Sequence, residues 1–174
     1  KGSDQWGPPR LDTAEIYDPG TGLWAEIGSM GKKREALSAH ALGDGRVLVT
    51  GGRAQQRYHK QTELWDRETN TWTRGPNMKT PRWQHAYVTL PDGRAMVIGG
   101  TDDIFAIVDK AEIFDPATDE WTQVGSMAQK RALQTATLLP DGRVLVTGGG
   151  KGGVGTETAP FDTSEIWDPA TGEW

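Results

Sequence analysis

Paired carboxylates recur along the chain at positions that would suit acid–base chemistry if they were unique. Glutamates occupy four such positions, and each is followed three residues later by an aspartate: Glu15, Glu63, Glu112 and Glu165. Two neighbouring carboxylates can serve as general acid and general base. A catalytic pair needs a single site, however, so a pair that recurs predicts turn capping and hydrogen bonding to the backbone instead.

Other reactive side chains are few. The chain has three histidines (His40, His59 and His85) and no cysteine. It contains no His-Glu-x-x-His, Gly-x-Ser-x-Gly or Walker sequence, so it lacks the usual zinc, nucleophile and phosphate motifs. A pair of His59 with Asp102 or Asp103 stays open, although a loop histidine is more often solvated. The sequence therefore predicts that this chain is no enzyme, and it predicts no catalytic residue, metal site or cofactor.

Composition narrows the class of protein further. The 174 residues include 19 basic and 24 acidic side chains, for a net charge of −5, which argues against a general nucleic-acid binder. No apolar run approaches the ~20 residues of a membrane-spanning helix, so we expect no membrane insertion. The 23 glycines and 8 tryptophans are typical of a β protein with many turns and aromatic anchors. Without cysteine, the redox compartment cannot be inferred.

The elements that must position these side chains repeat with a period near 49 residues. Four tryptophans are separated by 48, 49 and 53 residues: Trp24, Trp72, Trp121 and Trp174. Three arginines are separated by 48 and 49 residues, as are three Gly-Gly pairs: Arg34, Arg82 and Arg131, and residues 51–52, 99–100 and 148–149. Residues 14–52 align with 111–149 without a gap and are identical at more than half of the positions.

Within one period, turn residues separate four short segments that we expect to be strands. Residues 135–139 and 144–147 are strand-like and flank the hairpin turn Pro140-Asp141-Gly142. A Gly-Gly pair ends the second strand, which we expect to be buried on both faces, and a variable loop follows. A third strand then runs to an Asp-Pro turn, and the fourth begins at the recurring tryptophan. Four antiparallel strands per repeat predict one blade of a β-propeller.

These segments resemble a known repeat. Asp-Gly-Arg-Val-Leu-Val-Thr-Gly-Gly, Glu-Ile-Tyr-Asp-Pro and Trp-x(5)-Met are similar to kelch repeats, in the form common in bacterial kelch proteins and the galactose-oxidase-like propeller. The resemblance covers residues 13–174 and implies an all-β, kelch-type β-propeller of about three and a half four-stranded blades. Its divisions are a leader or linker (1–12), a half-blade of two outer strands (13–30) and blades at 31–78, 79–127 and 128–174, the last with a truncated strand.

Such a partial ring has two explanations. The chain is part of a longer kelch protein, which we favour, or two copies form a homodimeric propeller. The resemblance also implies that the strand after Arg131 lines the central channel. We expect the Gly-Gly pairs to allow close approach between blades, the four tryptophans to fill contacts between blades, Tyr17 to occupy a core position, and the three arginines to bind backbone carbonyls.

The resemblance allows specific tests for chemistry. Galactose-oxidase-like enzymes hold copper with two tyrosines and two histidines, and one tyrosine is crosslinked to a cysteine. That crosslink is impossible here because the chain lacks cysteine. The iron motif Glu-x(3)-Asp-x(3)-His of nitrile-specifier-like kelch proteins is also missing from the sequence.

Binding is most plausible where the repeats differ, in the loops after the Gly-Gly pairs. Strand alternation places these loops on one basic, aromatic-bearing face, opposite an acidic face of turns. The candidate binding residues are Arg53, Gln55, Arg57, Tyr58, His59, Trp83, Asp102, Asp103 and Phe105. Solvated loop charges are the alternative explanation. If the site is real, alanine at Arg57 or Tyr58 weakens binding and leaves the thermal midpoint nearly unchanged.

The function that follows is a non-enzymatic interaction module that presents variable loops to a protein or glycan partner. Two alternatives stay open. The chain is a scaffold fragment of a secreted galactose-oxidase-like or carbohydrate-active enzyme whose catalytic residues lie elsewhere, or it is a structural assembly segment. An extracellular or secreted location rests on the family resemblance alone.

Overall fold

The computed structural model describes residues 11–54, 57–102, 104–151 and 159–174. The described residues form strands and turns without any helix, so the all-β prediction is confirmed. None of these residues belongs to a helix capable of crossing a membrane. The strands are β1 (Ala14–Asp18), β2 (Leu23–Ile27), β3 (Glu35–Ala41), β4 (Val47–Ala54), β5 (Arg57–Tyr58), β6 (Glu63–Asp66), β7 (Thr71–Arg74), β8 (Ala86–Thr89), β9 (Ala95–Ile98), β10 (Ala111–Asp115), β11 (Glu120–Val124), β12 (Thr135–Leu138), β13 (Val144–Thr147) and β14 (Ser164–Trp167).

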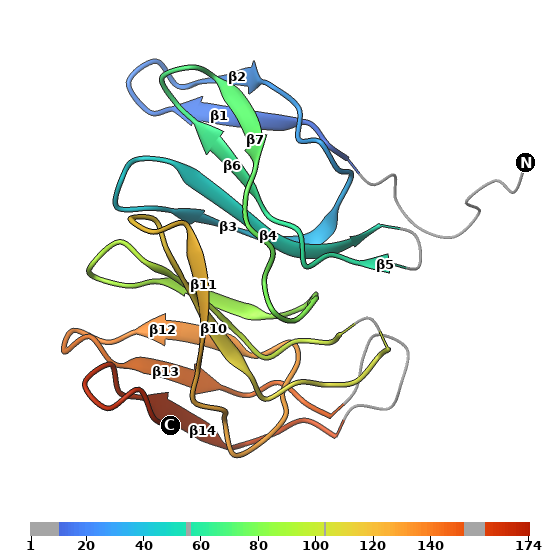
Figure 1. Ribbon diagram of the computed structural model, residues 1–174, viewed down its shortest axis with the longest axis vertical. Coiled ribbons are helices and arrows are strands. Elements are labelled where there is room, and N and C mark those ends of the chain that lie inside the picture. Colours follow the sequence, from blue (N-terminus) through green and yellow to red (C-terminus); the bar gives the residue numbers. More distant parts are fainter. Residues whose placement is uncertain (1–10, 55–56, 103, 152–158) are drawn as a thin grey trace, which may run out of the picture.

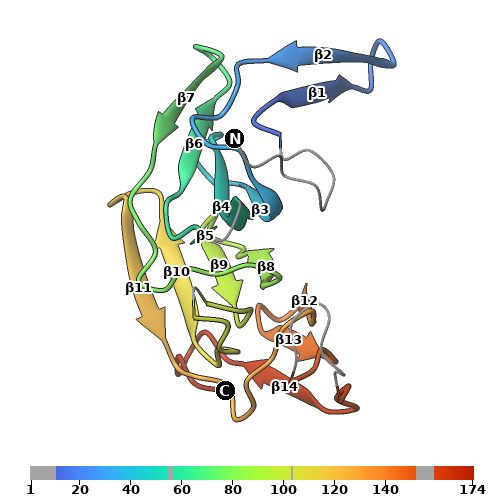
Figure 2. The ribbon, with the colours of Figure 1, turned by 90° about the vertical axis from the view of Figure 1, so that its right-hand side faces the viewer.

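The strands form four antiparallel sheets in chain order. β1 and β2 make a half-blade; β3, β4, β6 and β7, with β5 added to β4, make blade 1; β8 to β11 make blade 2; and β12 to β14 make blade 3. The sheets follow one another along an arc (Figure 2), with β8 and β12 on its concave side and β7 and β11 on its convex side. This partial ring is the architecture that the repeats predict.

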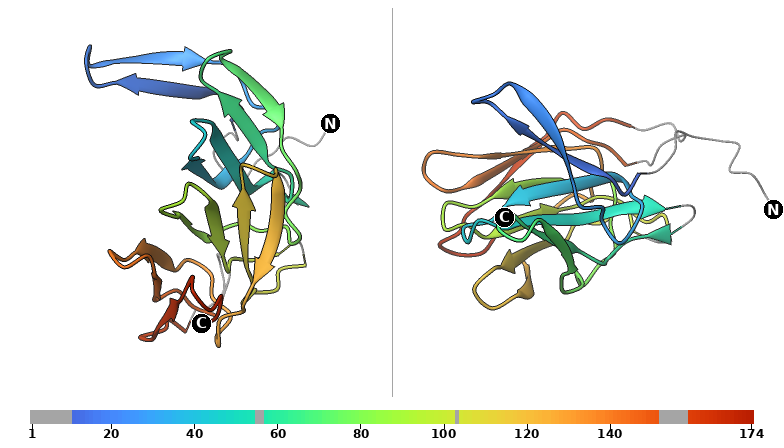
Figure 3. Two further views of the ribbon diagram at one scale, coloured as in Figure 1. Left: turned by 60° about the vertical axis from the view of Figure 1, so that its left-hand side comes forward. Right: turned by 90° about the horizontal axis from the view of Figure 1, so that it is seen from above.

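The two ends of the strands define two faces of the arc. The tight turns within the hairpins lie at one end, which we call the turn face. The loops between the second and third strands lie at the other, together with the connections between blades, and we call it the loop face (Figure 1). The view from above in Figure 3 separates the same two ends.

The Asp-Gly-Arg turns on the turn face share one set of hydrogen bonds. In blade 3, Leu139 N–H donates to the carbonyl of Arg143 at 2.8 Å, and Gly142 takes a φ of 87°. Asp141 accepts the backbone N–H of Arg143 at 3.1 Å and its Nε at 2.8 Å. Asp44 with Arg46, and Asp92 with Arg94, repeat these bonds. The recurring aspartates of the Asp-Pro turns cap them as expected; Asp168, for example, accepts Ala170 N–H at 2.8 Å.

The recurring arginines lie beneath the loop face and bind backbone carbonyls, as the repeat predicts. Arg82 is fully buried and donates to the carbonyls of Gly99 and Lys110 at 2.9 and 3.0 Å. Its partner, which the sequence reasoning missed, is the recurring glutamate: Arg82 Nη2 lies 2.6 Å from Glu112 Oε1. Glu112 also accepts the backbone N–H groups of Lys79 and Thr80. Arg34 with Glu63 and Arg131 with Glu165 repeat the pairing.

The Gly-Gly pairs allow the close approach between blades that the sequence predicts. Gly51 has a φ of 61°, and a Cβ there would lie 2.4 Å from the carbonyl oxygen of Arg82 in the next blade. Gly52 N–H donates to that same carbonyl at 3.0 Å. Gly99 meets the carbonyl of Arg131 in the same manner, so any side chain at these positions would separate the blades.

The tryptophan prediction is confirmed where a preceding blade exists and is wrong for the half-blade. Trp121 Nε1 donates to the carbonyl of Pro76 at 3.2 Å, and Trp174 Nε1 to that of Gly125 at 2.6 Å, each on the preceding blade. Trp24, in contrast, is 66% exposed, and Tyr17, expected in a core, is 47% exposed. The described residues place no sheet beside them on that side, so they pack on each other instead.

Apolar cores fill the two complete interfaces between blades. Leu48, Leu64 and Met78 of blade 1 pack with Phe114 and Trp121 of blade 2. Blades 2 and 3 share a second core of buried residues that includes Met96, Ile98, Val144, Val146 and Trp167. In β13 only alternate residues are buried, so the expectation of burial on both faces is wrong there, because the described residues place a neighbouring blade on only one side of blade 3.

Candidate functional site

Four of the predicted binding residues meet at the loop face between blades 1 and 2. The rings of Tyr58 and Trp83 are stacked, with centroids 5.3 Å apart and planes at 8°. Phe105 meets Tyr58 edge-on at 5.5 Å. The guanidinium of Arg53 lies 4.2 Å from the centre of the Trp83 ring, within the range of a cation–π contact. We call these four residues the aromatic cluster.

The backbone explains why these side chains meet. Arg53 and Tyr58 face each other where β4 pairs with β5. Trp83 directly follows the buried Arg82, and it pairs with Thr101 at the start of the next loop. Phe105 comes from that loop, so the cluster joins two blades through residues that are far apart in sequence.

The three rings of the aromatic cluster differ in their exposure to solvent. Tyr58 and Trp83 are 8% and 5% exposed, whereas Phe105 is 71% exposed and its neighbour Ile104 is 76% exposed. Asp102 shapes this tip, because its Oδ1 accepts the N–H groups of Ile104 at 3.0 Å and Ala106 at 2.8 Å. Phe105 itself has a φ of 62°. The loop therefore holds two large apolar side chains outward on a fixed turn, which we call the apolar tip.

Burial changes what is expected of Tyr58. Burial raises the pKa of its hydroxyl, against the opposing effect of Arg53. Arg53 is in turn paired with Glu35. The Tyr58 ring is buried and contacts both Trp83 and Phe105, so we now expect alanine at Tyr58 to lower the thermal midpoint as well, because removing a buried aromatic ring leaves a cavity.

The other predicted residues lie apart from the aromatic cluster or outside the described residues. The charges that act on His59 are Arg34, Lys32 and Glu63; burial and Arg34 lower its pKa. Asp102 is not among these charges and is bound to its own turn, so the acid–base pair of His59 with Asp102 does not form. Gln55 and Asp103 lie outside the described residues, as does the side chain of Arg57.

A buried polar cluster was missed by the sequence reasoning. Ser38 Oγ lies 2.8 Å from His85 Nε2 and 2.6 Å from Thr50 Oγ1, at the inner end of the interface between blades 1 and 2. His40 Nε2 lies 3.3 Å from Ser38 Oγ, and the His40 ring meets Tyr87 edge-on. We call Ser38, His40, Thr50 and His85 the inner polar cluster. A hydroxyl beside an imidazole is the pairing of a nucleophile and its base.

Burial makes the inner polar cluster structural. Ser38 is 3% exposed and His85 9%, so the hydroxyl and the imidazole are withdrawn from solvent. Burial lowers the pKa of His40 to about 4; burial, Arg82 and His40 lower the pKa of His85 well below its usual value. The signal was in the repeat itself, because the next blade has apolar residues at the positions of Ser38, His40 and Thr50: Ala86, Val88 and Ile98.

Comparison with known proteins supports the interpretation of the repeats. The family model "Kelch motif" matches residues 36–79 and 88–128, which run through blades 1 and 2 into the connections that follow them. This chain is a kelch-repeat protein. Its kelch repeats thus account for the recurring arginines, glutamates and Gly-Gly pairs as parts of the fold.

Several curated proteins are similar over parts of the kelch repeats. A galactose oxidase of Gibberella zeae is 29% identical over 96 residues, 54% of this chain and 14% of that protein. Kelch-like protein 30 of Homo sapiens is 40% identical over 62 residues, 34% of this chain and 11% of that protein. Kelch-like protein 35 of Mus musculus is 29% identical over 104 residues, 59% of this chain and 17% of that protein. The chain spans less than a fifth of each.

The residues present do not fit the copper site that the galactose-oxidase resemblance implies. The chain lacks cysteine, and within its described part no three His, Asp or Glu side chains gather as a metal site would require. Tyr58 stacks on Trp83, and His40 and His85 both turn Nε2 toward the hydroxyls of Ser38 and Thr50. No step of copper chemistry is therefore derived for these kelch repeats.

Proposed function

We propose that these kelch repeats form a non-enzymatic interaction module, and that the apolar tip of Ile104 and Phe105 contacts a protein partner. The observation that carries the proposal is the contrast in exposure at the aromatic cluster: buried Tyr58 and Trp83 support a largely exposed Phe105. Exposed large apolar side chains on a rigid support are typical anchors of protein interfaces.

Repetition supports the same assignment. The residues of the aromatic cluster do not recur at equivalent positions in the other blades, whereas the residues that hold the blades together do. A protein partner fits better than a glycan because the exposed surface of the tip is apolar, with an isoleucine beside the phenylalanine. A glycan presents hydroxyl groups, which would lose hydrogen bonds to water against such a surface.

The test uses a random peptide library selected against the purified chain, followed by affinity measurements. We expect Phe105→Ala to weaken binding of the selected peptides at least tenfold, since an aromatic anchor contributes more than about 1.4 kcal/mol. Its thermal midpoint stays close to that of the wild type because Phe105 is 71% exposed.

The matched control is Leu23→Ala, which removes a side chain that is 67% exposed and comes from the half-blade. It should leave peptide affinity unchanged. Equal loss of affinity in both variants, or selection of ligands that bind Phe105→Ala as tightly as the wild type, would contradict the proposal. Binding on a glycan array that is lost in Phe105→Ala would transfer the tip to a different class of partner.

The similarity to a galactose oxidase favours one second candidate. In it, this chain is the scaffold part of a secreted enzyme whose catalytic residues lie elsewhere. Metal analysis separates the two candidates: stoichiometric copper or iron in the purified protein would favour the scaffold role, and metal-free protein that binds the selected peptides would favour the interaction module.

A further inference from the structure

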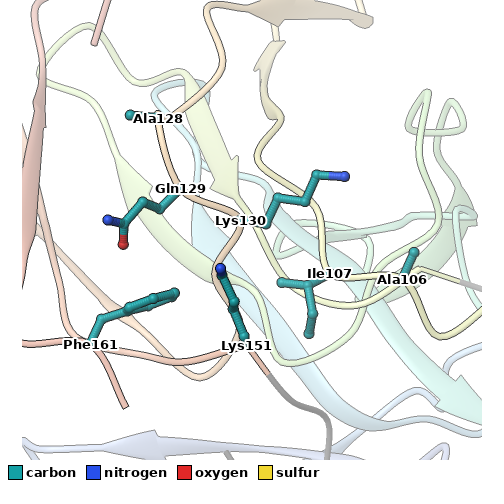
Figure 4. A pocket seen from close by; sticks show the side chains of 7 residues that line it. All are labelled: Ala106, Ile107, Ala128, Gln129, Lys130, Lys151 and Phe161. Atoms are coloured by element: carbon teal, nitrogen blue, oxygen red, sulfur yellow. The ribbon is translucent and has the colours of Figure 1, made fainter. Parts of the chain in front are cut away.

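A second feature of the loop face lies between blades 2 and 3, and its lining begins at Ala106, directly after the apolar tip. It is a pocket of about 530 Å³, within the usual size range of ligand sites. Seven residues line it: Ala106, Ile107, Ala128, Gln129, Lys130, Lys151 and Phe161. Figure 4 shows Lys151 between Phe161 and Ile107, with Gln129 next to Phe161 and Lys130 next to Ile107; the ammonium ends of the two lysines point in different directions. We call it the lysine pocket.

The charge of the lysine pocket has one sign. Lys130 and Lys151 are its two charged lining residues, and both are exposed. The nearest acidic residues along the chain, Asp109 and Asp162, do not line it. Among the ion pairs formed within the described ranges, neither lysine takes part. Two ammonium groups beside a concave surface attract an anionic group.

The uncharged lining residues indicate which chemical groups of a ligand would lie beside that anionic group. Ala106, Ile107, Ala128 and the ring of Phe161 are apolar. Gln129 Oε1 accepts from Thr163 Oγ1 at 3.2 Å, which leaves the NH₂ end of the amide to donate to a ligand. The Phe161 ring is steadied by the Arg131 guanidinium, 5.0 Å from its centre. A carboxylate next to an apolar side chain matches this combination.

The repeat shows that the lysine pocket is particular to one interface. The positions of Gln129, Lys130 and Lys151 in the preceding repeat are occupied by Thr80, Pro81 and Asp102. That interface therefore has an aspartate, bound within its own turn, where this one has a lysine. The difference reverses the sign of the charge at this one position.

We propose that the lysine pocket binds an acidic segment of a partner protein, with neighbouring carboxylates held by Lys130 and Lys151 and an adjacent apolar side chain against Ile107 and Phe161. The apolar walls favour a peptide over an acidic oligosaccharide, whose hydroxyl groups would face aliphatic carbon. The proposal stands without the apolar tip, because no residue of the tip lines the pocket.

The test is a titration followed by methyl NMR signals, since Ala106, Ile107 and Ala128 place methyl groups in the lysine pocket. The probe is acetyl-Phe-Glu-Glu-Phe-amide, and its control is the isosteric peptide with glutamine in place of glutamate. We expect the acidic peptide to shift these three methyl signals and to bind at least fivefold more tightly than the glutamine peptide, with the difference shrinking at high salt.

Variants locate the effect. Lys130→Gln and Lys151→Gln should each weaken the acidic peptide about twofold to fivefold, as expected for ion pairs near a surface. Lys110→Gln removes the same charge from an exposed residue that does not line the pocket, and it should leave the affinity unchanged. Equal binding of the two peptides, equal losses in all three variants, or tighter binding of an oligogalacturonate than of the peptide would overturn the proposal.

Phe105→Ala separates this proposal from the proposed function. It should abolish binding of the library-selected peptides and leave the response of the lysine pocket to the acidic peptide intact. Loss of both responses in Phe105→Ala would overturn the claim that the pocket acts independently of the tip.

Discussion

The turn face and the loop face are built on the same strands, yet they differ in how far they repeat. On the turn face, Asp44, Asp92 and Asp141 each pair with an arginine two residues later at 2.7 Å. On the loop face, the interface between blades 1 and 2 holds the aromatic cluster, and the next interface holds the lysine pocket. One face shows the same structure three times, and the other shows a different structure at each interface.

This difference in repetition distinguishes residues that hold the blades together from residues that are available to contact a partner. Beneath the loop face the Arg–Glu pairs still recur, at Arg34, Arg82 and Arg131, so the variable loops are supported by a structure that repeats. Each Arg–Glu pair holds its loop at both ends, because the arginine binds the carbonyl before the loop and one after it. Loops fixed in this way can vary in sequence without loss of the fold.

The largest loss of stability should come from breaking a buried Arg–Glu pair. Arg82→Ala leaves Glu112 buried without its cation and removes one hydrogen bond from each of two backbone carbonyls. Removal of one member of a buried pair costs about 3–5 kcal/mol, a large part of the stability of a typical domain. Urea denaturation followed by tryptophan fluorescence measures the loss. The more exposed pair of Arg94 with Asp92, within a single turn, supplies the control: Arg94→Ala should cost less than about 1 kcal/mol.

A loss of similar size in Arg94→Ala and Arg82→Ala would show that repetition, not burial, sets the importance of an arginine here. The contrast between the buried Arg–Glu pair and the exposed turn would then fail.

A smaller effect should come from acid, through the inner polar cluster. The pKa of His40 is about 4 in the folded chain, against about 6.5 for a free histidine, and the pKa of His85 is also well below that value. Both are neutral in the fold. As the pH falls through 6.5, the unfolded chain takes up protons that the folded chain does not, so stability falls. His40 alone accounts for about 2 kcal/mol between pH 7 and pH 5.

The matched variant combines His40→Val with His85→Gln, which installs the residues found at Val88 and Gln134 in the next repeats. Gln134 donates to the carbonyl of Ile98 at 2.7 Å, so glutamine has a known geometry for this position. Unfolding free energies measured at pH 7 and pH 5 should differ much less in the variant than in the wild type. An unchanged difference would rule out the two histidines as its source.

The smallest effect should come from the turn face. Arg143→Ala removes the partner of Asp141. The hydrogen bond from Arg143 lowers the pKa of that carboxyl, but both side chains are exposed, so solvent screens the interaction. The free energy of unfolding should therefore stay within experimental error of the wild type, as should affinity for the selected peptides. A measurable loss of affinity would place a binding site on the turn face and weaken the contrast between the two faces.

The fold was largely predictable because its signals recur. Arg82, Gly51 and Asp141 each have counterparts at the same spacing, and each does in the structure what the repeat suggests. Trp24 and Tyr17 were mispredicted because a repeat pattern implies a neighbour on each side, and the described chain gives the half-blade none on one side. Periodicity reports the position of a residue in a blade and does not report whether the next blade is present.

The candidate site was predictable only in part. Arg53, Tyr58, Trp83 and Phe105 stood out because they do not recur, but their stacking depends on the pairing of β4 with β5 and on the bridge from Trp83 to Thr101. Phe161 and the two lysines of the pocket were visible only as loop residues, because the concavity between blades exists only after the blades pack.

The most direct test of the contrast between the faces is to map where a selected peptide binds. Backbone amide spectra of the chain, recorded with and without a peptide from the library selection, give the answer in one titration. The account predicts shifts at Ile104, Phe105 and Ala106 on the loop face and unchanged signals for the turn-face glycines Gly45, Gly93 and Gly142. Shifts at those three glycines with an unaffected apolar tip would contradict it.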